Sequence, residues 1–317
     1  MRSAFFRALL ELAEQDPKVN LVVGDLGFGV VEEFTQRFPN RFLNAGVAEQ
    51  NMTGIAAGMA LSGRTVFTYS ITNFPILRCL EQVRNDICYH NANVKLVSVG
   101  GGLAYGALGA THHATEDLAI MRSLPRMLVV APGDPAEAEA ATRAVAIHPG
   151  PCYLRLGRAG ESRVHQRHID FQLGKAIQVR EGKDLTLIST GGLLETAVRV
   201  ANLLEANGLG AAVLSMHTVK PLDVDATLEA ARSTGAIFTL EEHSVLGGLG
   251  SAVSEVLAEF REGMVTFKRF GLPSDFSSMV GTQEFLREQH GLSTESLAVA
   301  IRSILEEDRS LTAVAGS

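Results

Sequence analysis

Short apolar runs alternate with longer amphipathic segments along the whole chain. The first half contains five runs of four to six residues, each rich in Leu or β-branched residues: Asn20–Val23, Thr65–Tyr69, Val94–Val99, Met127–Ala131 and Cys152–Leu156. The second half contains four more: Leu185–Ser189, Ala211–Ser215, Ala236–Leu240 and Val265–Phe270. Continuously apolar runs of this length are typical of parallel strands that are buried on both faces.

Helical periodicity fills the intervals between these runs. After an N-terminal amphipathic helix, the expected helices are Val30–Phe38, Val47–Leu61, Ile76–Tyr89, Ala114–Arg122, Pro135–Ala146, Leu194–Asn207, Ala226–Ala231 and Gly248–Phe260. Strands that alternate with helices predict an α/β fold with mainly parallel sheets. The pattern pauses in a polar stretch between Gly157 and Lys175, so we expect two consecutive domains, at residues 1–165 and 175–310.

Composition narrows the class of protein. The 28 basic and 35 acidic residues give a net charge of −7 without a basic stripe, which argues against nucleic-acid binding. No apolar run approaches the ~18–20 residues of a membrane span, and the N-terminus lacks the features of a signal peptide. The 3 cysteines have no paired spacing, which excludes a disulfide scaffold and favours the reducing cytoplasm.

The expected helix Val47–Leu61 is unusually rich in small residues. Gly54 and Gly58 each cost a helix about 1 kcal/mol relative to Ala, so their presence needs a reason. Spaced four apart, they allow close approach of another backbone, either the chain's own sheet or the same helix of a second subunit. Glu49 lies in the first turn, where the helix dipole favours a carboxylate without any function. Its small, apolar neighbours leave a second interpretation open, a buried carboxyl group that donates or shares a proton with a ring nitrogen.

A glycine-rich loop follows the run Val94–Val99. Residues 100–117 contain five glycines and the pair His112 and His113, and ligands of parallel sheets bind at the carboxyl ends of strands. The loop matches neither a dinucleotide-binding fingerprint nor a P-loop. His112 and Glu116 have a spacing that could bind a metal, but no third ligand is near, so an acid/base or hydroxyl-binding histidine is the favoured interpretation.

Two charged groups end other strands. Arg155 and Arg158 close the last run of the first domain, where they could bind a phosphate or carboxylate or form a surface salt bridge. The residues Glu241 to His243 precede glycines at 247, 248 and 250, which a tight turn into a helix explains without a ligand.

Together these segments resemble the transketolase family. The residues from Phe42 to Gly58 resemble the segment around the cofactor glutamate of transketolases and 1-deoxyxylulose-5-phosphate synthases, and 110–125 resemble their Thr-His loop. The order of the later segments, including 131–134 and 240–250, also agrees with the family. The resemblance implies a thiamine-diphosphate pyrimidine-binding fold followed by a transketolase C-terminal-like domain.

The resemblance also implies a function and a set of site residues. Glu49 would hydrogen-bond the aminopyrimidine ring nitrogen of thiamine diphosphate, and the cofactor would carry a two-carbon ketol unit from a ketose to an aldose. His112 would bind or protonate a substrate oxygen, and Arg158 would bind the acceptor's phosphate. Asp25 would lie near the thiazolium side of the cofactor. Phe74 is the candidate for stacking on the pyrimidine, with Tyr69 as the alternative.

The chain also departs from the family pattern. The diphosphate and magnesium motif, Gly-Asp-Gly followed by Asn, is absent, and the residues from Gly133 to Pro135 do not satisfy it. The resemblance therefore implies half of a split transketolase, an α2β2 assembly in which a separate subunit carries that motif and holds most of the Mg²⁺ ligands. Gly29, Gly100 and Leu108 replace polar substrate-binding residues, so the substrate is expected to be a small sugar or sugar phosphate other than an ordinary pentose phosphate.

Three alternatives stay open at this point. A 2-oxoacid dehydrogenase β subunit shares both domains, and a deoxyxylulose-phosphate-synthase-like enzyme would take pyruvate and an aldose. A non-catalytic regulatory or scaffold subunit would keep the fold without the chemistry. The sequence identifies neither the donor nor the acceptor sugar.

Overall fold

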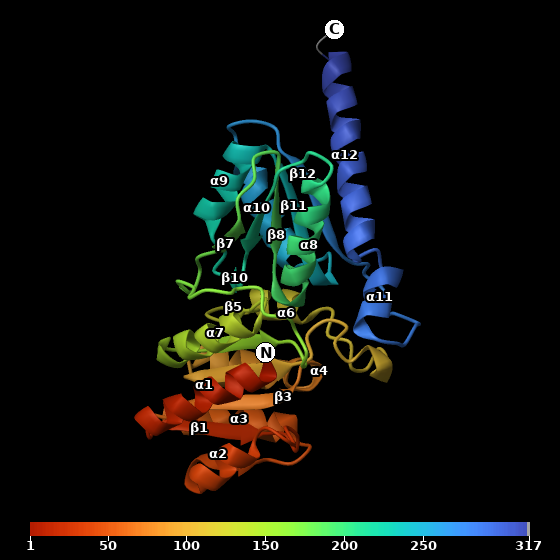
Figure 1. Ribbon diagram of the computed structural model, residues 1–317. Helices are drawn as coiled ribbons and strands as arrows, with labels where there is room; N and C mark the ends of the chain where they lie inside the picture. The colour runs from red at the N-terminus through yellow and green to blue at the C-terminus, as the bar shows by residue number, and fades with distance from the viewer. Residues whose placement is uncertain (316–317) are drawn as a thin grey trace.

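The computed structural model describes residues 1–315, with side chains described up to residue 308. It contains two α/β domains, one formed by the N-terminal half of the chain and the other by the C-terminal half (Figure 1). Helix α12 (Thr294–Ala315) runs along the second domain and projects beyond it (Figure 1). The predicted α/β class, with two domains and mainly parallel sheets, is confirmed.

The first sheet has seven strands in the order β10-β5-β6-β4-β3-β1-β2. Its strands are β1 (Val19–Val23), β2 (Phe42–Asn44), β3 (Thr65–Ile71), β4 (Val94–Val99), β5 (Leu128–Val130), β6 (Cys152–Leu156) and β10 (Thr218–Lys220). Every pairing is parallel except that of β10, which joins β5 antiparallel from the second half of the chain. No sequence pattern predicted this edge strand, because its three residues are too short to show a period.

Helices cover both faces of this sheet. They are α1 (Arg2–Gln15), α2 (Glu32–Arg37), α3 (Glu49–Leu61), α4 (Asn73–Leu77), α5 (Leu80–Gln82), α6 (Asp117–Ser123) and α7 (Pro135–Ile147), with 3-10 turns at Pro39–Arg41 and Gly106–Leu108. One apolar core lies under α1 and α7, and another lies under α3 and the segment Val83–Tyr89. Burial on both faces explains why the strands are apolar at consecutive positions.

One expected helix is not continuous. The segment predicted as a single helix from Ile76 to Tyr89 instead consists of the end of α4, the short α5 and a π-helix at Val83–Tyr89. The break at Arg78 and Cys79 turns the chain over α3, so that α3 contacts both α4 and the π-helix.

The second sheet has five strands in the order β12-β11-β8-β9-β7. Its strands are β7 (Ile177–Arg180), β8 (Leu185–Ser189), β9 (Ala211–Ser215), β11 (Ala236–Ser244) and β12 (Thr266–Leu272), of which only β7 pairs antiparallel. Its helices are a 3-10 turn at Gly191–Leu193, α8 (Leu194–Glu205), α9 (Val224–Thr234), α10 (Leu249–Glu259), α11 (Gln283–Gln289) and α12. The sequence patterns missed α11 and α12.

The polar segment between the two halves is tied to the start of α7. Asp134 caps that helix by accepting from the Glu137 backbone N–H (2.8 Å), and its second oxygen accepts from the backbone N–H groups of Val164 and His165 (both 2.9 Å). The His165 ring lies 2.7 Å from a Glu137 carboxylate oxygen. Asp134 therefore has a structural role at a helix N-terminus.

The small-residue face of α3 is open. A Cβ atom added at Gly54 or Gly58 would meet nothing within 4 Å, and both residues are exposed. Close packing on the chain's own sheet, one of the two expected reasons for these glycines, is therefore not what the structure shows.

Among residues 1–315, no helix combines the length and apolar character that crossing a membrane requires.

Candidate functional site

Glu49 is the first residue of α3 and only 1% of its surface is exposed. Its Oε2 atom accepts a hydrogen bond from Arg78 Nη1 at 2.8 Å. Its Oε1 atom is buried and has no hydrogen-bond partner within the described residues. Since a buried carboxylate oxygen without a partner costs free energy, Oε1 is the strongest indication of a polar ligand site among the described residues.

A tight turn lies beside this carboxyl group, at the end of β1. A Cβ atom at Gly24 would lie 3.5 Å from Glu49 Cγ and 3.6 Å from Ser70 Oγ, another buried oxygen without a partner among residues 1–315. The next residue, Asp25, is exposed and has a φ of +55°. Asn44, at the end of β2, holds it by donating to Asp25 Oδ1 (2.9 Å) and accepting from its backbone N–H (3.0 Å).

The loop after β4 is closed onto α4. The backbones of Gly102 and Ala114 form a reciprocal pair of hydrogen bonds at the base of the loop. The Asn73 side chain, at the start of α4, donates to the carbonyl oxygens of Thr111 (3.2 Å) and His113 (2.7 Å). These contacts hold the backbone on either side of His112, whose ring lies edge-on to Phe74 with the ring centroids 5.3 Å apart.

Further aromatic and cationic side chains contact Phe74 and His112. The Arg78 guanidinium lies over the Phe74 ring, 4.6 Å from its centroid. On the other side, the rings of His112 and Tyr105 are 6.4 Å apart, and the exposed Arg158 guanidinium lies 5.1 Å from the Tyr105 centroid. Burial raises the pKa of Tyr105, which keeps its hydroxyl protonated at neutral pH.

The structure therefore connects four of the five predicted residues, namely Glu49, Phe74, His112 and Arg158. Asp25 touches none of these four, but it follows the glycine that packs on Glu49. Two connecting residues, Arg78 and Tyr105, were not predicted. Tyr105 lies in the glycine-rich loop at residues 100–117, whereas no sequence signal distinguishes Arg78 from other exposed arginines.

Tyr105 also explains one departure from the family pattern. Gly100 has a φ of +88°, and a Cβ atom there would collide with the Tyr105 ring. The ring occupies the space that a side chain at position 100 would fill.

Arg155, the other arginine at the end of β6, is fully engaged within the chain. Its guanidinium pairs with Asp117 (2.7 Å) and donates to the carbonyl oxygens of Ala114 and Glu242. Burial opposes its charge, but Asp117 outweighs burial and raises the pKa of Arg155. Burial and Asp117 also raise the pKa of Tyr153, whose hydroxyl donates to Asp117 at 2.5 Å. Arg155 therefore joins the two halves, and neither of the uses expected from sequence applies to it.

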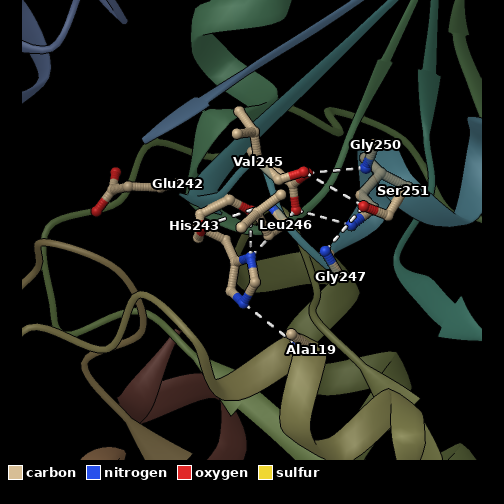
Figure 2. A network of polar contacts seen from close by, with 12 residues as sticks. Ala119, Glu242, His243, Val245, Leu246, Gly247, Gly250 and Ser251 are labelled. Carbon is tan, nitrogen blue, oxygen red and sulfur yellow. Dashed lines mark hydrogen bonds and ion pairs between the residues drawn. The ribbon is translucent and has the colours of Figure 1, made fainter. Parts of the chain in front are cut away.

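The acidic end of β11 has a similar joining role. Glu241 accepts from the backbone N–H groups of Leu249 (2.7 Å) and Gly250 (2.8 Å) at the start of α10. His243 Nε2 accepts from the Ala119 backbone N–H (3.3 Å), so it contacts α6 of the first half, whereas Glu242 points the other way (Figure 2). A tight turn into a helix, as expected from the glycines, accounts for this segment.

No group of three or more His, Cys, Asp or Glu side chains among residues 1–315 could hold a metal ion. The unpartnered Oε1 of Glu49 and the Phe74 ring, which Arg78 links, instead suit a planar heteroaromatic ring that carries a nitrogen.

Comparisons with known proteins identify the class. Residues 1–160 match the model of the transketolase pyrimidine binding domain, and residues 174–297 match the model of the transketolase C-terminal domain. The chain belongs to the transketolase family, whose members use thiamine diphosphate.

Similar curated proteins include subunits of transketolases. The chain is 39% identical over 307 residues to the 6-deoxy-6-sulfo-D-fructose transketolase subunit SqwH of Clostridium sp. (strain MSTE9), covering 96% of this chain and 94% of that protein. It is 39% identical over 298 residues to one of the apulose-4-phosphate transketolase subunits of Phocaeicola vulgatus, covering 93% and 94%. A 1-deoxy-D-xylulose-5-phosphate synthase of Pelotomaculum thermopropionicum is 33% identical over 305 residues, and the match covers 47% of that protein.

Solved structures agree with this family. One described as a split gene transketolase, inactive beta4 tetramer, has a TM-score of 0.89 at 40% identity, covering 96% of this chain and 98% of its own. The transketolase of Campylobacter jejuni has a TM-score of 0.81 at 19% identity, with 46% of that chain covered, and this shows a common fold.

Proposed function

We propose that this chain is the pyrimidine-binding subunit of a split transketolase, which transfers a two-carbon ketol unit from a ketose to an aldose. The observation that carries the proposal is the buried Glu49, whose Oε2 is held by Arg78 while Oε1 has no partner among the described residues. Thiamine diphosphate supplies the nucleophilic carbon and the electron sink for such a transfer. Its magnesium and diphosphate ligands are assigned to a separate subunit in an α2β2 assembly, and the 3 unpaired cysteines favour the cytoplasm.

Each residue of the site has a proposed role. Glu49 Oε1 shares a proton with the aminopyrimidine ring nitrogen in a hydrogen bond, and Phe74 offers its ring face to the pyrimidine. Asp25 lies toward the thiazolium side. His112, half-buried and hydrogen-bonded through Nδ1 to the Thr111 hydroxyl (3.0 Å), moves a proton to or from a substrate oxygen.

Arg158 is assigned to the anionic end of the sugar. Its side chain is exposed and, among the described side chains, contacts only the Tyr105 ring, so it is available to a ligand. The substrates named for the two curated transketolase subunits above carry a sulfo and a phosphate group, respectively. We therefore propose a sugar with an anionic terminal group as the substrate.

The first experiment isolates the assembly and tests Glu49 in it. A tagged chain is purified from source cells, the co-purifying subunit is sequenced, and ketol transfer is measured on the complex. Glu49→Gln is expected to lower kcat about 10²–10⁴-fold, because it removes the carboxyl partner of the ring nitrogen. The control Glu81→Gln changes an exposed glutamate of the neighbouring α5 and is expected to keep wild-type kcat.

The same preparation separates the alternatives. Wild-type kcat in Glu49→Gln would favour the scaffold role and refute the catalytic assignment. Decarboxylation of pyruvate without ketol transfer would favour a 2-oxoacid dehydrogenase subunit. A chain that purifies without a partner would contradict the split-enzyme proposal.

A further inference from the structure

Arg78 contacts both parts of the proposed pyrimidine site. It follows directly after α4, donates to Glu49 Oε2 at 2.8 Å and lies over the Phe74 ring at 4.6 Å. About half of its side chain (49%) is exposed, whereas that of Glu49 is 1% exposed. One flexible surface side chain therefore holds the two groups that the cofactor ring would contact.

The geometry of a carboxylate makes this contact selective. Glu49 has two oxygens, and Arg78 engages only Oε2, so Oε1 remains the free acceptor. A planar guanidinium can donate in its plane while its face lies on an aromatic ring, which an ammonium group cannot do. With Oε2 fixed, the direction of Oε1 is fixed as well.

Within residues 1–308, Arg78 is the one side chain that donates to the Glu49 carboxylate. The nearby Thr53 hydroxyl donates to the Glu49 backbone carbonyl instead (2.8 Å). Removing Arg78 would leave a buried carboxylate with two free oxygens and several rotamers, and the Phe74 ring would lose the cation on its face.

We infer that Arg78 is a positioning residue that orients Glu49 Oε1 toward the aminopyrimidine of the cofactor. This inference rests on the proposed function, since it presumes that Glu49 contacts that ring.

The test uses the assembled complex and measures the Kd of thiamine diphosphate by calorimetry, together with kcat and the donor KM. Arg78→Ala is expected to weaken thiamine diphosphate binding about tenfold or more, as the loss of one charge-assisted hydrogen bond implies, and to lower kcat with the donor KM unchanged. Arg78→Lys, which keeps the donor and the charge, is expected to recover part of both losses. Arg84→Ala is the matched control, because Arg84 is exposed and, within residues 1–308, its side chain bonds only to the adjacent Asn85.

A double-mutant cycle with Glu49→Gln distinguishes positioning from a general structural role. If Arg78 acts through Glu49, adding Arg78→Ala to Glu49→Gln changes Kd by no more than about twofold. Binding of a thiamine diphosphate analogue with CH in place of the ring nitrogen is expected to be equally insensitive to Arg78→Ala. If Arg78→Ala does not assemble, Arg78→Gln takes its place with the same expected direction.

The outcomes separate the two proposals. Wild-type Kd and kcat in Arg78→Ala, additive losses in the double variant, or an equal loss of analogue binding would overturn the positioning role alone. Wild-type Kd and kcat in Glu49→Gln would overturn the proposed function, and the positioning role with it.

Discussion

The oxygens of Glu49 differ because of a single contact. Arg78 takes Oε2, while Oε1 is buried without a partner in the described part of the chain. A carboxylate with one engaged and one free oxygen is prepared for a ligand, since the free oxygen gains a hydrogen bond only when that ligand arrives. The free energy of that hydrogen bond therefore contributes to ligand binding and not to the stability of the unliganded fold.

The two arginines at the end of β6 also differ in environment. Arg155 is 4% exposed and satisfied by Asp117 and two carbonyl oxygens, whereas Arg158 is exposed and lies over a tyrosine ring. Residue type and position made both arginines candidates, and the difference in burial agrees with the resemblance, which assigns the phosphate to Arg158. Only Arg158 is available to an anionic ligand.

Arg158→Ala is expected to raise the KM for an anionic acceptor about tenfold or more, because one charge-assisted contact is lost. The KM of a neutral acceptor and the melting temperature are expected to change little. Arg167→Ala, at an exposed position of the same segment, serves as the control. Equal, small changes with charged and neutral acceptors would show that Arg158 does not read the substrate's charge.

At the scale of elements, the connecting segment and α7 form a buried titrating cluster. Burial lowers the pKa of His165, but its bond to Glu137 and the charges of Glu137 and Asp134 outweigh this, so the pKa of His165 is raised. Burial alone dominates for His217 and lowers its pKa to about 4. His217 is stacked on Phe171 at 3.9 Å, and its Nε2 has no partner among the described residues.

Stability is expected to fall as the pH drops from 6.5 to 4. In this window an unfolded chain protonates His217 near its ordinary pKa of 6.5, whereas the folded chain does not do so until about pH 4. The free energy of unfolding therefore falls by roughly 3 kcal/mol as the pH drops from 6.5 to 4. His217→Phe removes this titration, so its melting temperature is expected to fall less steeply between pH 6.5 and 4.5.

His168→Phe, at an exposed position of the connecting segment, is the control and should keep the wild-type slope. An equally steep slope in His217→Phe would show that other groups cause the loss at acid pH. The pH dependence that His165 causes has the opposite sign. Its stabilisation of the folded state is complete below pH 6.5 and is lost as the pH rises through its raised pKa.

At the scale of the whole molecule, the open face of α3 indicates assembly. Gly54 and Gly58 have free space above them, and large apolar side chains are exposed on and beside the helix: Val47, Leu61, Leu77 and Leu80. Glycine weakens an exposed helix, so its use here suits close approach of a second backbone. The α2β2 assembly that we propose would bury this face.

Gly58→Ala is expected to stabilise the isolated chain by up to about 1 kcal/mol, because alanine favours the helix and meets no clash. The larger Gly58→Leu is expected to weaken the assembled complex, as sedimentation and activity at low protein concentration would reveal. Gly263→Ala, another open position but in a loop, is the control. An intact, fully active complex carrying Gly58→Leu would show that this face is not an interface.

The order of the elements followed from local pattern. Buried parallel strands need consecutive apolar residues, so all nine expected strands are present, most of them within two residues of their expected bounds. The prediction of one continuous helix from Ile76 to Tyr89 was wrong. The helix breaks at Arg78, and this break depends on how α4 and α5 pack over α3. The proposed domain bounds at residues 165 and 175 stay a prediction, and β10 crosses between the two halves.

The sequence by itself determined the α/β class from the alternation of strands and helices, and the family from the resemblance of several segments. That resemblance in turn supplied the roles of the candidates Glu49, Asp25, Phe74, His112 and Arg158. Only the tertiary structure decided which side chains meet. Glu49 and Arg78 are 29 positions apart, and Arg155 and Glu242 are 87 apart. Such pairs form because separate helices and strands pack together, and a periodic pattern in one segment holds no record of that packing. The free oxygen of Glu49, the space taken by the Tyr105 ring and the open face of α3 are consequences of that packing.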